Sequence, residues 1–331
     1  MKKVIAALII AVMVVSISAC SNKYKKTIPP DNPSAKEDVK EPSSETNTSD
    51  AQVDDKDLET KKNDTTTGDS NVIEEKSEKP NEEVKEEAKI DNIPKGLSNE
   101  AISSWMPARN KEHKVPVLNS KYKNILDKYD GYFVGDTSSK VIYLTFDEGY
   151  EYKYTGKILD ILKDNDVKAN FFLVKSYIKS NPELVKRMVN EGHVIGNHTV
   201  SHPNMPNLLS QKGVDAVAKE LNDTADYFKE VTGKDMPKFF RPPEGTWSEA
   251  LLYVTKSMGY KTILWSMAHR DWEVNNQPGR EASYKFVDDY YHNGAILLLH
   301  PQSQSNTEAL DDIIKNLKSK GYTFAPLTDL K

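Results

Sequence analysis

The sequence predicts an α/β fold built on a parallel sheet, and the pattern of apolar residues carries this prediction. Short apolar runs alternate with amphipathic helical patterns from about Lys140 to the C-terminus. The runs at 141–146, 170–174 and 295–299 are apolar almost throughout, which is typical of strands buried on both faces of a sheet. This alternation fits an open doubly wound sheet or a closed barrel.

Each expected element follows from a local signal. Strands are expected where β-branched, aromatic and large aliphatic residues cluster, and in chain order these runs are 141–146, 170–174, 193–195, 239–240, 262–265, 295–299 and 323–324. Helices are expected where apolar residues recur three and four positions apart. They are a segment around Ile158, Ile161 and Leu162, then 182–189, 212–231 and 251–258, and last the stripe Leu310, Ile313, Ile314 and Leu317.

The N-terminal 20 residues have the order of a secretory signal. Two lysines precede an apolar run at 4–15, which is shorter than the ~20 residues that a membrane-spanning helix needs. Small residues before Cys20 resemble a bacterial lipobox, so we expect a lipoprotein signal at 1–20, a lipidated Cys20 and an anchor on the extracytoplasmic face of the cell membrane. The alternatives are an uncleaved anchor or an ordinary signal with an incidental cysteine. With Cys20 as the single cysteine, disulfides and thiolate metal sites are excluded.

Composition divides the rest of the chain. Residues 21–95 are rich in charged residues, Ser, Thr, Asn and Pro, which predicts a disordered linker with a reach of roughly 50 Å. Residues 96–139 form a lead-in segment, and 140–331 form one catalytic domain. The formal net charge is −5 with both signs interleaved, which argues against nucleic acid as a partner.

Five reactive side chains share one topological position. Each lies at or soon after the end of an expected strand: Asp147, His198, Arg241, Asp271 and His300. In a closed (β/α) barrel these ends form one rim, where the loops converge into an active site. A single polar residue at a strand end is commonly a cap or turn former, but five in the same position indicate a site.

The residue types indicate metal-assisted hydrolysis. His198 and His202 lie four residues apart, so on a helical turn both imidazoles can face one ion. Asp147 and Glu148 supply carboxylates beside a core strand, one suited to a general base and the other to an oxygen ligand. The histidine spacing alone is only moderately specific, and an isolated Asp-Glu pair is usually solvated.

Five ordered motifs then resemble one enzyme family. They are Thr145-Phe146-Asp147-Glu148-Gly149, His198-Thr199-Val200-Ser201-His202, Arg241-Pro242-Pro243-Glu244-Gly245, Asp271-Trp272 and Leu297-Leu298-Leu299-His300. These motifs resemble the polysaccharide deacetylases of carbohydrate esterase family 4, also called the NodB-homology family, over about 140–331. Within this family, the chain is similar to the peptidoglycan N-acetylmuramic acid deacetylases that form muramic δ-lactam in spore cortex. This finer similarity lies in residues 149–151, the lead-in from 121 to 137 and the tail 306–312.

The resemblance implies a distorted (β/α) barrel and a role for each motif residue. It implies a general base at Asp147 and an acid at His300. It further implies that Arg241 orients the base and Asp271 holds the acid. For the substrate it implies an oxyanion donor at the backbone N–H of Glu244, a methyl pocket at Leu298 and a contact at Trp272. The implied metal ligands are Glu148, His198 and His202, for a divalent ion that is preferably zinc, with cobalt or manganese as alternatives.

Two departures from the family pattern bear on function. Glu148 stands where the family has a second aspartate, which puts metal affinity in doubt. Glu244 replaces an aromatic residue after the two prolines and alters the expected floor of the substrate site. His193 and His269 are assigned no role.

The expected function is deacetylation of N-acetylmuramic acid by a monomer acting on the peptidoglycan glycan strand. Deacetylation of N-acetylglucosamine is the first alternative. A catalytically inactive wall-binding lipoprotein, motivated by Glu148, and a glycosidase using Asp147 and Asp271 are the others.

Overall fold

The computed structural model describes residues 93–330. The predicted signal with Cys20 and nearly all of the linker 21–95 lie outside these residues and stay predictions. Within 93–330, no helix combines the length and apolar character needed to span a membrane.

The strands of the described chain form one parallel sheet of eight. They are β1 (Gly131–Tyr132), β2 (Val141–Glu148), β3 (Asn170–Leu173), β4 (Val194–Asn197), β5 (Phe239–Phe240), β6 (Lys261–Ile263), β7 (Ala295–Leu299) and β8 (Thr323–Phe324). Their order is β1-β6-β5-β4-β3-β2-β7, with β8 beside the start of β2, and all these pairings are parallel. The predicted α/β fold with a parallel sheet is therefore confirmed.

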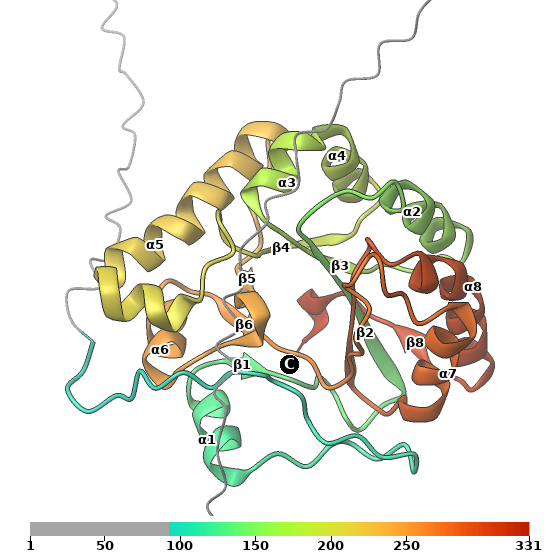
Figure 1. Ribbon diagram of the computed structural model, residues 1–331, viewed down its shortest axis with the longest axis horizontal. Coiled ribbons are helices and arrows are strands. Elements are labelled where there is room, and N and C mark those ends of the chain that lie inside the picture. The colour runs from blue at the N-terminus through green and yellow to red at the C-terminus, as the bar shows by residue number, and fades with distance from the viewer. Residues whose placement is uncertain (1–92, 331) are drawn as a thin grey trace, which may run out of the picture. The chain divides into compact units, whose positions relative to one another are not determined.

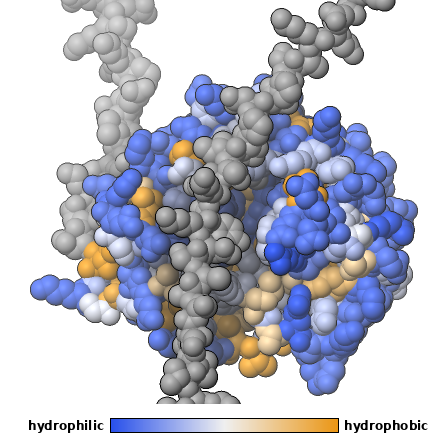
Figure 2. All heavy atoms as spheres, in the orientation of Figure 1, coloured by the Kyte–Doolittle hydropathy of each residue, from blue (hydrophilic) through white to orange (hydrophobic). Residues whose placement is uncertain are grey.

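The helices lie around the outside of the strands (Figure 1). They are α1 (Ser120–Lys128), α2 (Thr155–Asp164), α3 (Lys175–Ser180), α4 (Pro182–Asn190), α5 (Met205–Thr232), α6 (Glu249–Ser257), α7 (Arg280–Tyr290) and α8 (Gln304–Ser319), with short 3₁₀ helices η1 (Pro243–Gly245) and η2 (Leu327–Asp329). Most of the surface visible in Figure 2 is hydrophilic, as expected when helices turn their apolar faces inward.

Two helical features differ from the sequence prediction. The helix expected at 212–231 begins earlier, at Met205, where the side chain of Asn204 caps it, and Gly213 interrupts it with a φ of 78°. Helices α1, α3 and α7 were not predicted. In α7 only Ser283 and Val287 are buried, so the segment lacks a continuous apolar stripe.

Backbone hydrogen bonds join the two ends of the sheet. The N–H of Ser266, just after β6, donates to Ile296 O of β7 at 3.1 Å, and Leu298 N–H donates back to Met267 O at 2.9 Å. Gly135, just after β1, donates to Gly294 O at 2.8 Å. The sheet thus takes the form of a distorted barrel. The lead-in segment belongs to this barrel, because β1 lies within it.

Strand β2 shows how the barrel is packed. Successive side chains of a strand point to opposite faces. Ile142, Leu144 and Phe146 pack in the cluster shared with α2, α4 and α8, whereas Tyr143 packs in a second cluster with Phe172 and other residues inside the barrel. Both faces are buried, as the apolar runs predicted, and the inward face leads to the site.

Gly196 of β4 is required by the packing inside the barrel. A Cβ added there would lie 2.5 Å from the ring of Phe172 and 3.2 Å from Phe239 O. We expect Gly196→Ala to reduce the free energy of unfolding by about 1–3 kcal/mol through overpacking. Gly156→Ala in α2 is the matched control, because no atom lies within 4 Å of its added Cβ and alanine favours a helix by about 0.5–1 kcal/mol. Equal denaturant midpoints for the two variants would contradict this expectation.

Candidate active site

Asp147 and Arg241 form a buried ion pair at the carboxyl end of β2. Arg241 Nη1 donates to Asp147 Oδ1 at 2.7 Å and to Thr145 Oγ1 at 2.9 Å. Its other nitrogens donate to Ile263 O and Leu264 O, and the guanidinium carbon lies 4.2 Å from the centre of the Phe172 ring. Every Arg241 nitrogen thus has a partner, so the arginine is a rigid support for the carboxylate.

The charges around Asp147 keep it ionised. Burial alone would raise the pKa of Asp147, but the positive charges facing it, led by Arg241, outweigh burial and hold the pKa below its ordinary value. Asp147 is therefore a carboxylate at neutral pH. Its second oxygen, Oδ2, lies 3.8 Å from Nε2 of His198.

His198 is a buried neutral imidazole. Its Nδ1 lies 2.8 Å from Arg241 O. Because a carbonyl oxygen can only accept, Nδ1 carries the hydrogen and the lone pair is on Nε2. Burial lowers the pKa of His198 to about 4, so the ring is uncharged at neutral pH. A neutral imidazole with a free Nε2 lone pair can bind a metal or accept a proton.

His202 lies beside His198, but on a loop and not on the predicted helical turn. The two ring centres are 4.9 Å apart. Thr199 and His202 have φ values of 74° and 54°, which are incompatible with a right-handed helix. Glu220 of α5 holds this loop, because its Oε2 accepts from the N–H groups of Val200 and Ser201 at 2.8 and 3.0 Å. Nothing in the local sequence pattern indicated this role of Glu220.

Asp271 and His300 form the second ion pair of the site. His300 Nδ1 lies 2.7 Å from Asp271 Oδ1, and His300 N–H donates to Asp271 Oδ2 at 2.8 Å. Burial lowers the pKa of His300, but the charge and hydrogen bond of Asp271 outweigh it and raise the pKa above its ordinary value. The Trp272 ring lies 5.7 Å from the His300 ring, and 45% of Trp272 is exposed, as a substrate contact requires.

The structure brings these two pairs to the same edge of the sheet. The charges of His300 and Asp147 act on each other, and each shifts the pKa of the other residue in the direction that favours its charged form.

Leu298 is buried inside the barrel two residues before His300. Glu244, in η1, adopts a left-handed conformation with φ 60° and ψ 8°, and its side chain is exposed.

Glu148 is not brought to the two histidines. It follows Asp147 in the strand, so its side chain points to the opposite, helix-facing side. There Thr155 Oγ1 donates to its Oε1 at 3.3 Å, and its Oε2 is buried with no hydrogen-bond partner. Burial, and then the charge of nearby Glu151, raise the pKa of Glu148 well above its ordinary value. The arrangement differs from the predicted ligand set of two imidazoles and this carboxylate.

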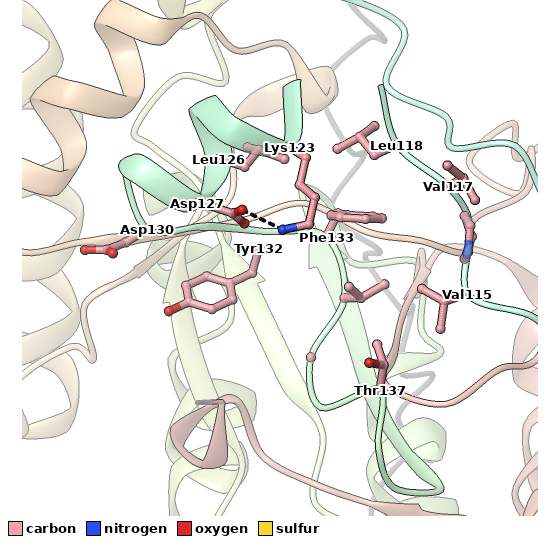
Figure 3. Close-up of a pocket in the computed structure, with 14 residues that line it drawn as sticks. Val115, Val117, Leu118, Lys123, Leu126, Asp127, Asp130, Tyr132, Phe133 and Thr137 are labelled. Atoms are coloured by element: carbon pink, nitrogen blue, oxygen red, sulfur yellow. Dashed lines mark hydrogen bonds and ion pairs between the residues drawn. The ribbon is translucent and has the colours of Figure 1, made fainter. Parts of the chain in front are cut away.

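A pocket elsewhere in the molecule is not part of this site. It has a volume of about 660 Å³ and is lined by α1, β1 and residues 115–118. Figure 3 shows the Lys123–Asp127 ion pair among its lining residues. None of the predicted site residues lines it.

Fold and side chains together define the class of protein: an α/β enzyme with acid and base groups at the carboxyl edge of a parallel sheet. Residues 134–263 match the polysaccharide deacetylase family. A peptidoglycan-N-acetylmuramic acid deacetylase, PdaA, of Bacillus subtilis is 43% identical over 234 residues, which cover 71% of this chain and 87% of the relative. A peptidoglycan-N-acetylglucosamine deacetylase of Bacillus cereus is 35% identical over 216 residues, which cover 62% of this chain and 73% of the relative.

A solved structure agrees with these sequence relatives. The structure of Bacillus subtilis PdaA, described as a family 4 carbohydrate esterase, superimposes with a TM-score of 0.67 at 42% identity, covering 71% of this chain and 98% of that chain. The chain belongs to the polysaccharide deacetylases of carbohydrate esterase family 4. It is therefore a hydrolase of amide bonds.

Members of this family generally use a divalent metal, and part of the site suits one. Two imidazoles, one of them held neutral with its Nε2 free, are the donors that zinc and similar ions prefer. Within residues 93–330, however, no three His, Cys, Asp or Glu side chains are grouped to hold an ion. His198 and His202 thus fit a metal, and Glu148 in its present position does not complete the set.

Proposed function

We propose that this protein hydrolyses the N-acetyl amide of N-acetylmuramic acid in peptidoglycan. One observation carries the proposal: an ionised Asp147 and a carboxylate-held His300 lie at one edge of the sheet, close enough to act on each other electrostatically. A carboxylate and an imidazolium are the base and acid that amide hydrolysis needs. With the anchor predicted at Cys20, the domain would act at the outer face of the membrane.

In the proposed mechanism, Asp147 accepts a proton from water while the water oxygen bonds to the amide carbonyl carbon. Arg241 holds the carboxylate in place through the 2.7 Å hydrogen bond. The backbone N–H of Glu244 donates to the developing oxyanion, and Leu298 contacts the acetyl methyl group. His300 then donates its proton to the nitrogen as the C–N bond breaks, which yields acetate and a free amine.

A divalent ion held by His198 and His202 would polarise the amide carbonyl, which is a poor electrophile on its own. The protein's own contribution at these positions is to keep His198 neutral by burial and to orient its ring through Arg241 O.

The choice of muramic acid is supported by the relative that is 43% identical and named for this substrate. A free amine on muramic acid lies near the lactyl carboxyl of the same sugar, so a six-membered lactam can close at high effective concentration. The proposed final product is therefore muramic δ-lactam, as in spore cortex. The exposed carboxylate of Glu244 weighs against this choice, because it would repel the lactyl group.

The test is incubation of the full-length protein with peptidoglycan, followed by acetate measurement and mass spectrometry of the digested muropeptides. We expect acetate release, loss of acetyl from muramic acid and no new reducing ends. Free amines on glucosamine with intact muramic acetyl groups would instead favour the glucosamine activity, for which the relative at 35% identity is named. New reducing ends would indicate a glycosidase. Binding without acetate release would indicate an inactive wall-binding protein.

A further inference from the structure

Asn306, on the first turn of α8, lies buried between Asp271 and His269. Its Nδ2 donates to Asp271 Oδ2, the same oxygen that accepts from the backbone of His300. Its Oδ1 lies 3.0 Å from Nε2 of His269. Only 1% of Asn306 is exposed, so water cannot replace these partners.

The orientation of the amide follows from its partners. A carboxylate oxygen only accepts, so the NH₂ group of Asn306 must face Asp271 and the amide oxygen must face His269. His269 Nε2 therefore carries the hydrogen and donates to Asn306. The His269 ring is itself stacked on Phe286 with ring centres 4.6 Å apart.

The helix end also holds Asn306 in place. Ser303 caps α8, and its Oγ accepts from Asn306 N–H at 3.1 Å. Gln277 links this cap to the loop that carries Asp271, because its Oε1 accepts from Ser303 Oγ at 2.6 Å and its Nε2 donates to Asp271 O at 2.9 Å. Asn306 thus occupies a fixed position relative to the carboxylate.

We infer that Asn306, oriented by His269, is a positioning residue that fixes the Asp271 carboxylate so that its Oδ1 faces Nδ1 of His300. This inference rests on the proposed role of His300 as the acid. Without Asn306, Asp271 Oδ2 keeps the backbone donor of His300 and the more distant His269 Nε2 at 3.9 Å, and the carboxylate is held less firmly against rotation away from the imidazole. The network extends the site from the His300–Asp271 pair to His269, which has no assigned role in the chemistry.

The first experiment compares Asn306→Leu with Asn316→Leu in the full-length protein. Asn316 is a matched control, because its Nδ2 also donates to an aspartate, Asp288, at 2.7 Å. This residue lies about 15 Å further along α8 than Asn306. We expect Asn306→Leu to lower kcat about tenfold with little change in KM, since the lost hydrogen bond is made to a charged group. The control is expected to retain its kcat.

A double-mutant cycle separates positioning from general destabilisation. If Asn306 acts through Asp271, then Asn306→Leu should lower kcat by no more than about twofold in an Asp271→Asn background. A tenfold loss in both backgrounds would overturn the inference.

His269→Gln, which keeps a donor for Asn306, should retain more activity than His269→Phe, which keeps only the stacking. Equal activities of these two variants would remove His269 from the network.

A spectroscopic readout makes the test independent of turnover. In the full-length protein, the Nδ1 proton of His300 bound to a carboxylate should give a low-field proton resonance in NMR. We expect Asn306→Leu to shift or broaden this resonance and Asn316→Leu to leave it unchanged. If the wild-type protein releases no acetate, the proposed function fails, and the resonance still decides whether Asn306 positions the pair. An unchanged resonance in Asn306→Leu overturns the inference.

Discussion

Asp147→Asn is expected to lower kcat for acetate release by at least ~10²-fold, because it removes the proposed general base. Asparagine has the same shape, and its Oδ1 can still accept from Arg241, so the substitution tests proton acceptance more than packing. The measurement is initial-rate acetate release from peptidoglycan, with circular dichroism to establish that the variant is folded.

Asp223→Asn provides the matched control for this substitution. Asp223 also pairs with a basic side chain, Lys219, at 2.7 Å, but both residues lie within α5 and both side chains are at least partly exposed. Its variant should retain wild-type activity. A folded Asp147→Asn protein with near-normal acetate release would rule out Asp147 as the base.

His300→Ala is expected to have an effect of similar size, at least ~10²-fold on kcat, because the amine is a poor leaving group without an acid. The pH profile gives a second readout. The pKa of His300 is raised, so in the wild type the activity should fall only above the ordinary imidazole value of about 6.5. The pKa of Asp147 is lowered, so this carboxylate should not itself set an acidic limb above the ordinary carboxyl value of about 3.9.

The alkaline limb should disappear in His300→Ala and move to lower pH in Asp271→Asn, because Asp271 provides the charge and hydrogen bond that raise the pKa. His113→Ala is the control: His113 is half-buried and stacks on Tyr291, and no site residue is among its described contacts. An alkaline limb that persists unchanged in His300→Ala would assign the acid role to another group.

The fold and the position of the site follow from local sequence patterns to a large extent. Apolar runs such as 141–146 and 295–299 identified β2 and β7, and the residues directly after them were expected at one edge of the sheet. That expectation needs no knowledge of packing, because all strands of a parallel sheet end at the same edge. The structure places Asp147, His198, Arg241, Asp271 and His300 there, in two hydrogen-bonded groups.

Strand β1, which the sequence did not predict, is stabilised by a distant partner. Strand β1 has two residues and is a strand only because it pairs with β6, about 130 positions along the chain. The hydrogen bonds that join β7 to residues 266–267 likewise connect segments that no local pattern relates.

What the sequence determined by itself was the type of each reactive residue and its place at a strand end. The tertiary structure decided which of these residues meet. Asp147 and Glu148 are adjacent carboxylates, but alternation along β2 turns one toward Arg241 and the other toward Thr155. The histidine loop and the Asn306–Asp271 contact depend on hydrogen bonds from α5 and α8, whose donors and acceptors lie 19 to 35 positions away in the chain. Such contacts arise only when the helices pack against the sheet, because their energy comes from burial of paired polar groups and not from local propensity.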